Sequence, residues 1–221
     1  MLHEEDNELD FELNFDFNTN SISQMEYDDL IKPYGEALSV IKLRLNSLNE
    51  EYRSRSIDYP IHNIQNRIKS KKSITKKLIH KNRTISKESA KDSLTDIAGI
   101  RVICYFEQDI YNVVSAIKKQ GDLIVIKECD YVKCPKENGY RSYHIVLGIP
   151  VFSLEETEYY PVEIQIRTLT MDLWASMEHR ICYKNGHNIE VTDDTRNMLL
   201  LYAQGLKKME EDMLQQNFKL L

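Results

Sequence analysis

The chain has 221 residues, of which 42% are hydrophobic and 29% are charged, and its formal net charge is −6. This composition is that of a globular protein, and the length suits one domain with appendages. No apolar run approaches the ~20 residues of a membrane-spanning helix, and the acidic residues 1–20 do not resemble a signal peptide. We therefore expect a cytoplasmic protein with no membrane partner.

Charge is distributed unevenly along the chain. Residues 1–29 contain ten Asp and Glu and no Lys or Arg, whereas residues 67–91 contain ten Lys and Arg against one acid, Glu88. A basic block inside an acidic protein indicates a local polyanion site, with a solvated lysine-rich helix face as the alternative. The acidic segment 1–24 has no hydrophobic periodicity, so we expect a disordered tail there.

The first regular element expected is a long helix. Apolar residues recur at spacings of three and four from Tyr27 to Tyr52, and Pro33 fits best in the first turns of such a helix. Residues 60–68 are expected to be extended, and residues 73–82 to form a short basic helix.

Strands and helices then alternate. The β-branched run at 100–106 predicts a strand, and the apolar spacing at 110–117 predicts a helix that Gly121 closes as its C-terminal cap. Three more strands are expected. An acidic turn joins the last two, which should therefore be antiparallel. Their ranges are 123–131, 142–150 and 159–167. This interleaving predicts an α/β or α+β domain built on one mixed sheet.

Two helices are expected to complete the chain. Leu169, Leu173, Met177 and Ile181 should face one way on the first, and Thr192 should be the N-cap of the second. The second helix has an apolar stripe that could serve core packing or an oligomer interface. Its members are Met198, Leu199, Tyr202, Leu206, Met209 and Met213. The four cysteines (Cys104, Cys129, Cys134 and Cys182) form no CxxC pair, which favours reduced thiols over zinc or disulfides.

Two segments carry carboxylates that could bind a metal ion. Alternation along 162–167 places Glu163, Gln165 and Arg167 on one side of a strand. Such a side could be the floor of a polar site or the solvated outer face of a sheet. Asp96 offers a second carboxylate just before the strand at 100–106, although it could be an ordinary turn residue. Carboxylates hold Mg²⁺ while Lys and Arg neutralise phosphates, so the set suits a Mg²⁺–triphosphate site. There is no P-loop motif.

A third segment, residues 138–144, suits recognition of a base. Gly139 allows a tight turn, Tyr140 offers a flat face for stacking, and Asn138 can bind a base edge. His144 reaches the same side one alternation beyond Ser142. The alternative is the entry to a hairpin with packed tyrosines.

Together these segments resemble the synthetase domain of the RelA/SpoT-homologue family, in the form of its small, single-domain alarmone synthetases. The resemblance covers roughly residues 27–215, with a synthetase domain at 25–190 and a C-terminal helix at 191–221 that could serve oligomerisation. The matching pieces are 67–69 with Lys77, 96–101, 130–131, 135–136, 138–144, 163–168, 174–176, 178–179 and 183–184.

The resemblance implies a nucleotidyltransferase-like mixed sheet of about five strands flanked by helices, with helical extensions at both ends. It also implies transfer of diphosphate from ATP to the 3′-hydroxyl of GTP or GDP, giving AMP and (p)ppGpp, with Mg²⁺ as cofactor, no hydrolase domain and a homotetrameric assembly. By position, the ATP residues are Arg67, Lys69, Lys77 and Arg101; the metal and catalytic residues are Asp96 and Glu163, the latter as proton acceptor; and the acceptor residues are Lys136, Asn138, Tyr140, His144 and Gln165.

Two positions depart from the family pattern. Cys129 stands where a basic residue commonly helps to hold the 5′-phosphates of the acceptor, and residues 60–67 do not carry the Pro-Phe-x-Thr-Gly stretch linked to allosteric alarmone binding. The first departure suits an alternative function, a toxin-type synthetase that pyrophosphorylates the 3′ end of tRNA, although the net negative charge disfavours it. A nucleotide sensor with an inactive site is a third alternative, which the intact Asp96, Glu163 and Tyr140 disfavour.

Overall fold

A computed structural model describes residues 21–55, 59–184, 187–188 and 192–220. Its centre is a five-stranded mixed sheet in the order β1-β2-β5-β4-β3, in which β2 and β5 are parallel and the other neighbours are antiparallel. The strands are β1 (Ile61–Ile68), β2 (Ala98–Cys104), β3 (Ile124–Asp130), β4 (Tyr143–Phe152) and β5 (Thr157–Thr168). The predicted mixed sheet and the antiparallel β4–β5 pair are confirmed.

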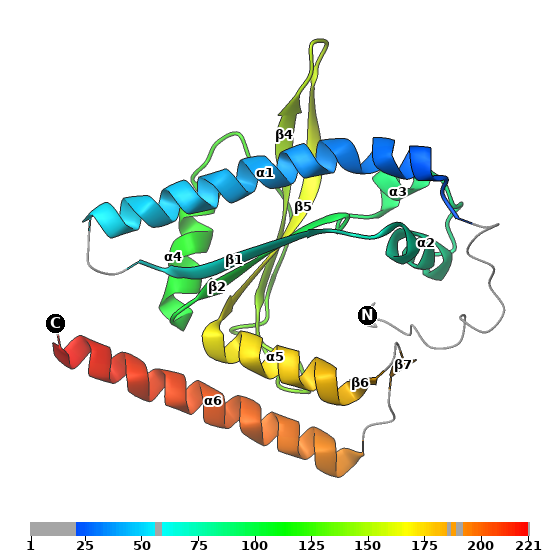
Figure 1. The fold of residues 1–221 in the computed structure, drawn as a ribbon. Coiled ribbons are helices and arrows are strands. Elements are labelled where there is room, and N and C mark those ends of the chain that lie inside the picture. The colour runs from blue at the N-terminus through cyan, green and yellow to red at the C-terminus, as the bar shows by residue number, and fades with distance from the viewer. Residues whose placement is uncertain (1–20, 56–58, 185–186, 189–191, 221) are drawn as a thin grey trace.

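Helices flank this sheet, as predicted (Figure 1). The long α1 lies across it, the β4–β5 hairpin projects beyond α1, and α5 and α6 lie side by side (Figure 1). The helices are α1 (Gln24–Arg55), α2 (Lys71–His80), α3 (Lys87–Ser93), α4 (Glu107–Lys118), α5 (Leu169–Cys182) and α6 (Asp193–Leu220), and a small hairpin of β6 (Tyr183–Lys184) and β7 (His187–Asn188) follows α5. None of these described helices is long and apolar enough to cross a membrane.

The core lies on one face of the sheet. Val162, Ile164 and Ile166 of β5 are fully buried there and pack with apolar residues of α1 and α4. The alternate residues of β5 point to the opposite face, which is polar. The strand alternation that the sequence predicts for residues 162–167 is therefore present.

Two details of the helices correct the sequence analysis. The helix α1 begins at Gln24, so Pro33 lies well inside it and not in its first turns. The early start has a local cause, because Ser23 and Glu26 form a reciprocal capping box: the Glu26 N–H donates to Ser23 Oγ over 3.2 Å, and the Ser23 N–H donates to Glu26 Oε2 over 2.9 Å.

Gly121 does not cap α4. The C-cap is Lys119, which has a right-handed conformation and donates its N–H to the Ser115 carbonyl, while the Gln120 N–H donates to the Ile117 carbonyl. Among the glycines of the described residues, Gly139 has a positive φ and Gly121 does not. The helix thus ends before Gly121 by tightening its last turn, which needs no glycine. At the start of α6, Thr192 does accept a bond from the Thr195 N–H, as an N-cap does.

The apolar stripes of α5 and α6 lie largely on the surface. Leu169, Leu173, Met177 and Ile181 are all exposed, and the buried side of α5 consists of Met171, Trp174 and Ala175. The α6 stripe divides, because Leu199 is buried and Leu206 partly buried against α5, whereas its other members are exposed: Met198, Tyr202, Met209 and Met213. The acidic tail predicted for residues 1–24 falls mainly on residues 1–20, outside the described residues.

Candidate active site

The register of the sheet gathers the polar side chains on its open face. Gly99 of β2 pairs with Arg67 of β1 on one side and with Glu163 of β5 on the other. Directly paired residues point to the same side of a sheet. Two residues further along β2, the same side of the sheet carries a row of directly paired residues, one from each strand: Gln65, Arg101, Gln165, His144 and Cys129. Gly99 places no side chain between Arg67 and Glu163, and the Arg67 side chain lies 3.9 Å from the position that a Cβ would take there.

Two lysines from the α2 region face Asp96, which directly precedes β2. The Nζ of Lys69 lies 2.6 Å and that of Lys77 2.8 Å from Asp96 Oδ2. The other oxygen, Oδ1, is buried and has no hydrogen-bond partner among the described residues. A buried carboxylate oxygen without a partner is costly, so it indicates a place for a further ligand.

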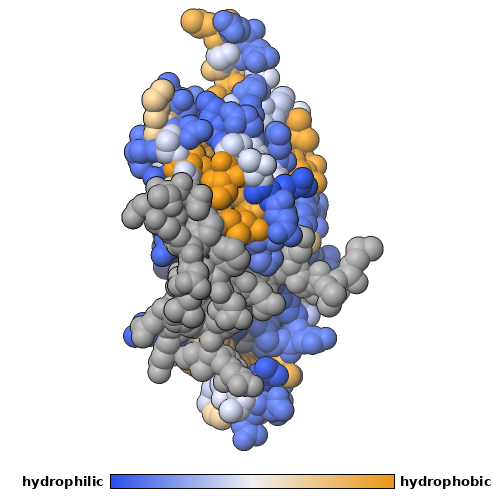
Figure 2. All heavy atoms as spheres, turned by 90° about the vertical axis from the view of Figure 1, so that its right-hand side faces the viewer, coloured by the Kyte–Doolittle hydropathy of each residue, from blue (hydrophilic) through white to orange (hydrophobic). Residues whose placement is uncertain are grey.

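Local structure holds the lysines in place. The Lys69 N–H donates to the Ile97 carbonyl over 2.8 Å, and Tyr27 of α1 donates its hydroxyl to the Lys69 carbonyl. Ser70 then caps α2 by accepting the Ser73 N–H. Lys77 lies further along this helix and projects from it toward Asp96. The end of the molecule that carries α2 and α3 is mainly hydrophilic, with a small hydrophobic area near its centre (Figure 2).

Both carboxylates of the site have a lowered pKa. Burial by itself raises the pKa of Asp96, but the charges and hydrogen bonds of Lys69 and Lys77 outweigh burial and bring it below the usual value. Burial likewise raises the pKa of Glu163, as does the nearby charge of Asp96, but the polar and charge interaction with His144, helped by the hydrogen bond from Gln165, outweighs both. The two groups are therefore ionised at neutral pH and close enough to affect each other.

The acceptor-side residues form a connected set around Tyr140. Its hydroxyl lies 2.8 Å from His144 Nε2 and accepts from Arg167 Nη2 over 2.5 Å. His144 Nδ1 lies 3.7 Å from Glu163 Oε1, and Gln165 Nε2 donates to Glu163 Oε2 over 3.4 Å. The structure thus joins the stacking residue suggested by the sequence to the candidate catalytic carboxylate through one histidine.

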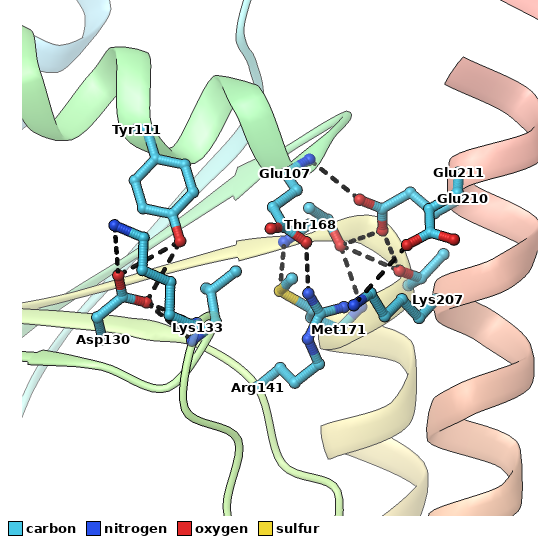
Figure 3. Close-up of polar contacts among 12 residues, drawn as sticks. Glu107, Tyr111, Asp130, Lys133, Arg141, Thr168, Met171, Lys207, Glu210 and Glu211 are labelled. Atoms are coloured by element: carbon cyan, nitrogen blue, oxygen red, sulfur yellow. Dashed lines mark hydrogen bonds and ion pairs between the residues drawn. The ribbon is translucent and has the colours of Figure 1, made fainter. Parts of the chain in front are cut away.

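An aromatic wall borders this set. The Tyr131 ring meets Tyr140 and His144 edge to face, and the Nζ of Lys136 lies 5.0 Å from the centres of both tyrosine rings. Asp130 shapes the turn before the wall, because it accepts the backbone N–H of residues 132 and 133 and the hydroxyl of Tyr111 (Figure 3).

Asn138 is placed differently from its neighbours in the motif. Its Oδ1 accepts the Tyr140 N–H over 3.0 Å, and its Nδ2 donates to Glu178 of α5 over 3.4 Å. In this structure its side chain shapes the loop. Contact with a base edge, as the sequence analysis expects, remains a prediction.

Three residues of the site were assigned no binding or catalytic role in the sequence analysis. Arg167 is buried and bonds to Tyr140 and Gln165, while Asp172 of α5 lies 3.3 Å from Arg101 and 3.4 Å from Arg167. Tyr131 supplies the aromatic wall. Alternation on β5 already placed Arg167 on the polar face, but no local pattern links Asp172 to Arg101, which is far away in the sequence.

The two candidate adenine residues lie on adjacent strands. Burial, followed by the charges of Arg167 and Arg67, lowers the pKa of Arg101, so the guanidinium groups lie within electrostatic reach of one another. We expect Arg101→Lys to raise the Michaelis constant for ATP by about tenfold, because an ammonium cannot stack on a base or keep the planar contact with Asp172. Titration of ATP binding and steady-state kinetics test this. Unchanged constants would exclude Arg101 from the donor site.

The fold and this polar face together indicate a class of protein. Two ionised carboxylates, with two lysines beside one of them and tyrosine and histidine rings near the other, are the kind of set that an enzyme transferring groups between anionic substrates needs. The chain belongs to the RelA/SpoT family, because the family model for the region found in RelA/SpoT proteins matches residues 66–188, more than half of its length.

Individual relatives extend this match beyond the family region. GTP pyrophosphokinase YwaC of Bacillus subtilis is 41% identical over 165 residues, covering 74% of this chain and 79% of that protein. The crystal structure of small alarmone synthetase 1 from Bacillus subtilis bound to its product pppGpp has 30% identity and a TM-score of 0.78, and covers 89% of this chain and 98% of that one. Small alarmone synthetase 2 from the same organism gives 36% identity, a TM-score of 0.76, and coverage of 88% and 99%.

Proposed function

We propose that the chain is a GTP pyrophosphokinase, which transfers the β,γ-diphosphate of ATP to the 3′-hydroxyl of GTP or GDP and releases AMP and (p)ppGpp. The observation that carries this proposal is the ionised pair Asp96 and Glu163 between the lysines of the α2 region and the Tyr140 pocket. The relatives support it, since YwaC is named a GTP pyrophosphokinase and synthetase 1 was solved with pppGpp and with AMPCPP.

On the donor side, Lys69 and Lys77 neutralise phosphate charge, and Arg67 with Arg101 holds adenine. Transfer of a phosphoryl-type group depends mainly on positioning and charge neutralisation, so lysines fixed by a capped helix suit the task. The lysines reach Asp96 from two different points of the chain, which keeps both ammonium groups beside the carboxylate pair.

On the acceptor side, Tyr140 stacks on guanine, with Lys136, Asn138, His144 and Gln165 around it. Glu163 accepts the proton of the attacking 3′-hydroxyl, which its ionised state allows. His144 lies between Tyr140 and Glu163 and orients the carboxylate through its ring nitrogen. The acceptor hydroxyl therefore has its base and its stacking surface on one side of the sheet.

The residues fit Mg²⁺. No group of three or more His, Cys, Asp or Glu side chains gathers as a metal site in the part of the chain that the structure describes. Mg²⁺ commonly uses one or two protein carboxylates and completes its shell with water and substrate phosphates. Asp96, with its unpartnered Oδ1, and Glu163 would hold it. When bound, it would neutralise charge on the diphosphate being transferred.

The exposed apolar side chains of α5 and α6 support a homo-oligomer, and we propose a tetramer on the strength of the family resemblance. A run of four exposed apolar residues on one side of α5 is a surface that soluble monomers seldom leave open. It consists of Leu169, Leu173, Met177 and Ile181. Light scattering measures the assembly directly.

Modification of a tRNA end remains the alternative, and one observation favours it. Cys129 pairs with His144 on the open face of the sheet, so an uncharged side chain stands beside the acceptor pocket. Phosphates held there would gain no charge-assisted hydrogen bond from this position.

Acceptor specificity decides between the two functions. We expect the protein, incubated with ATP labelled in its terminal phosphates, to transfer label to GTP and GDP and not to deacylated tRNA, as thin-layer chromatography and denaturing gels would show. Glu163→Gln protein serves as the matched blank. Labelled tRNA with no guanosine product would overturn the proposed acceptor while leaving the donor half intact.

A further inference from the structure

A buried carboxylate on the last helix has no part in the proposed reaction. Glu210 of α6 is 6% exposed. Its Oε1 accepts the backbone N–H of Glu107, the first residue of α4, over 3.0 Å. Its Oε2 accepts the hydroxyls of Thr168, over 2.6 Å, and of Thr170 (Figure 3). One side chain thus joins α6 to the start of α4 and to the junction of β5 with α5.

This arrangement satisfies a group that is otherwise costly to bury. A carboxylate removed from water needs several donors, and here three donors from two separate parts of the chain converge on it. The N-terminus of α4 also carries partial positive charge that favours an anion. Glu210 therefore specifies where α6 docks more sharply than apolar packing alone would.

Two short paths lead from Glu210 to the acceptor pocket. Thr168 directly follows Arg167, whose guanidinium donates to the Tyr140 hydroxyl over 2.5 Å. Glu107 uses its side chain to pair with Arg141, the residue after Tyr140 (Figure 3). The first path ends at the Tyr140 hydroxyl, and the second ends at the residue next to Tyr140.

The loop that carries Tyr140 is also packed directly against α6. Gly139 has φ +93°, and a Cβ built there would lie 2.8 Å from the Cβ of Ala203, so only glycine allows this approach. Trp174 of α5 donates its indole N–H to the Leu199 carbonyl over 2.8 Å, and its ring centre lies 6.5 Å from that of Tyr140. The helix α6 thus packs directly behind the loop that carries Tyr140.

We propose that Glu210 is a positioning residue, through which α6 sets the place of Tyr140 and hence the affinity for the acceptor base. The identity of the ligand rests on the proposed function. Within the described residues, the hydrogen bonds of Glu210 do not reach Lys69, Lys77 or Asp96. Arg101 of the donor side is connected less directly, through Asp172 to Arg167. Loss of Glu210 should therefore weaken acceptor binding more than ATP binding.

Steady-state kinetics of the full chain test this selectivity. We expect Glu210→Ala to raise the Michaelis constant for GTP about tenfold, because one buried and two partly buried donors lose their acceptor, and to change the Michaelis constant for ATP little. Glu210→Gln should recover most of the affinity, since an amide can accept the Glu107 N–H and donate to a threonine hydroxyl. Glu211→Ala is the matched control, because Glu211 is half exposed and lies 3.8 Å from Lys207. It should behave as wild type.

A second measurement needs no nucleotide. Trp174 is the single tryptophan of the chain and contacts both α6 and the side of the pocket. In Glu210→Ala, the emission of Trp174 should shift to the red, and acrylamide should quench it more strongly. Both are measured below the melting temperature of the variant, which circular dichroism gives. Thr168→Val, which is nearly isosteric, should change both readouts in the same direction if Glu210→Ala does not fold.

The outcomes separate the two proposals. Wild-type protein that makes no product from GTP or GDP would refute the proposed function, and the tryptophan signal would then decide the positioning role alone. Equal increases in the two Michaelis constants, or unchanged GTP kinetics and unchanged emission in the folded variants, would overturn the role of Glu210.

Discussion

Glu163→Gln is expected to lower the rate of diphosphate transfer by about 10²–10⁴-fold, the usual contribution of a general base. Glutamine keeps the volume of the side chain and can still bond to Gln165, but it neither accepts a proton nor carries charge. Because the pKa of Glu163 lies below its ordinary value, the wild-type carboxylate is ionised at pH 6 and pH 8 alike. The loss of rate should therefore be similar at both values.

A matched control lies on the same strand. Glu158 of β5 is partly exposed and pairs with Lys91, outside the polar face described above. Glu158→Gln should leave turnover unchanged, and circular dichroism should show both variants folded. Turnover near the wild-type level in Glu163→Gln would remove this residue from the mechanism.

Tyr140→Ala is expected to raise the Michaelis constant for the guanine acceptor by roughly 10- to 100-fold, since a stacked base contributes about 1–3 kcal/mol. Tyr140→Phe separates the two roles of the side chain. It keeps the ring but loses the contacts of the hydroxyl with His144 and Arg167. Acceptor affinity should then be largely retained, and turnover should fall because His144 loses its partner beside Glu163.

Kinetics with GTP and with GDP measure both effects. Tyr159→Ala is a suitable control, because Tyr159 is an exposed tyrosine of the β4–β5 hairpin. It should change neither constant. An unchanged acceptor constant in Tyr140→Ala would mean that the base binds elsewhere, even if turnover fell.

The sequence is most informative where structure follows from a repeat along one segment. The alternation at residues 162–167 predicts both the buried face of β5 and the polar face with Glu163 and Gln165, because successive side chains of any strand point to opposite sides. The periodicities that predict α1, α4 and α5 are equally local. The motif around Gly139 also predicts its turn, which the positive φ confirms.

Local patterns are less informative where two different structures satisfy them. The stripe of Leu169, Leu173 and Met177 has the spacing of a core-facing helix, yet the structure turns it outward. The opposite side of α5 is buried instead, because Trp174 finds a hydrogen-bond partner in α6. Periodicity indicates that a helix has an apolar side, but not which neighbour covers it.

The sequence by itself therefore determined the elements other than α3 and the β6–β7 hairpin, the mixed sheet, the family, and a set of candidate residues on separate segments. Only the tertiary structure decided how those residues meet: that Lys69 and Lys77 share one oxygen of Asp96, that His144 lies between Tyr140 and Glu163, and that Glu210 reaches Thr168. The reason is physical. These contacts join residues far apart in the chain, and their geometry depends on strand register and helix docking, which arise from the packing of the whole core.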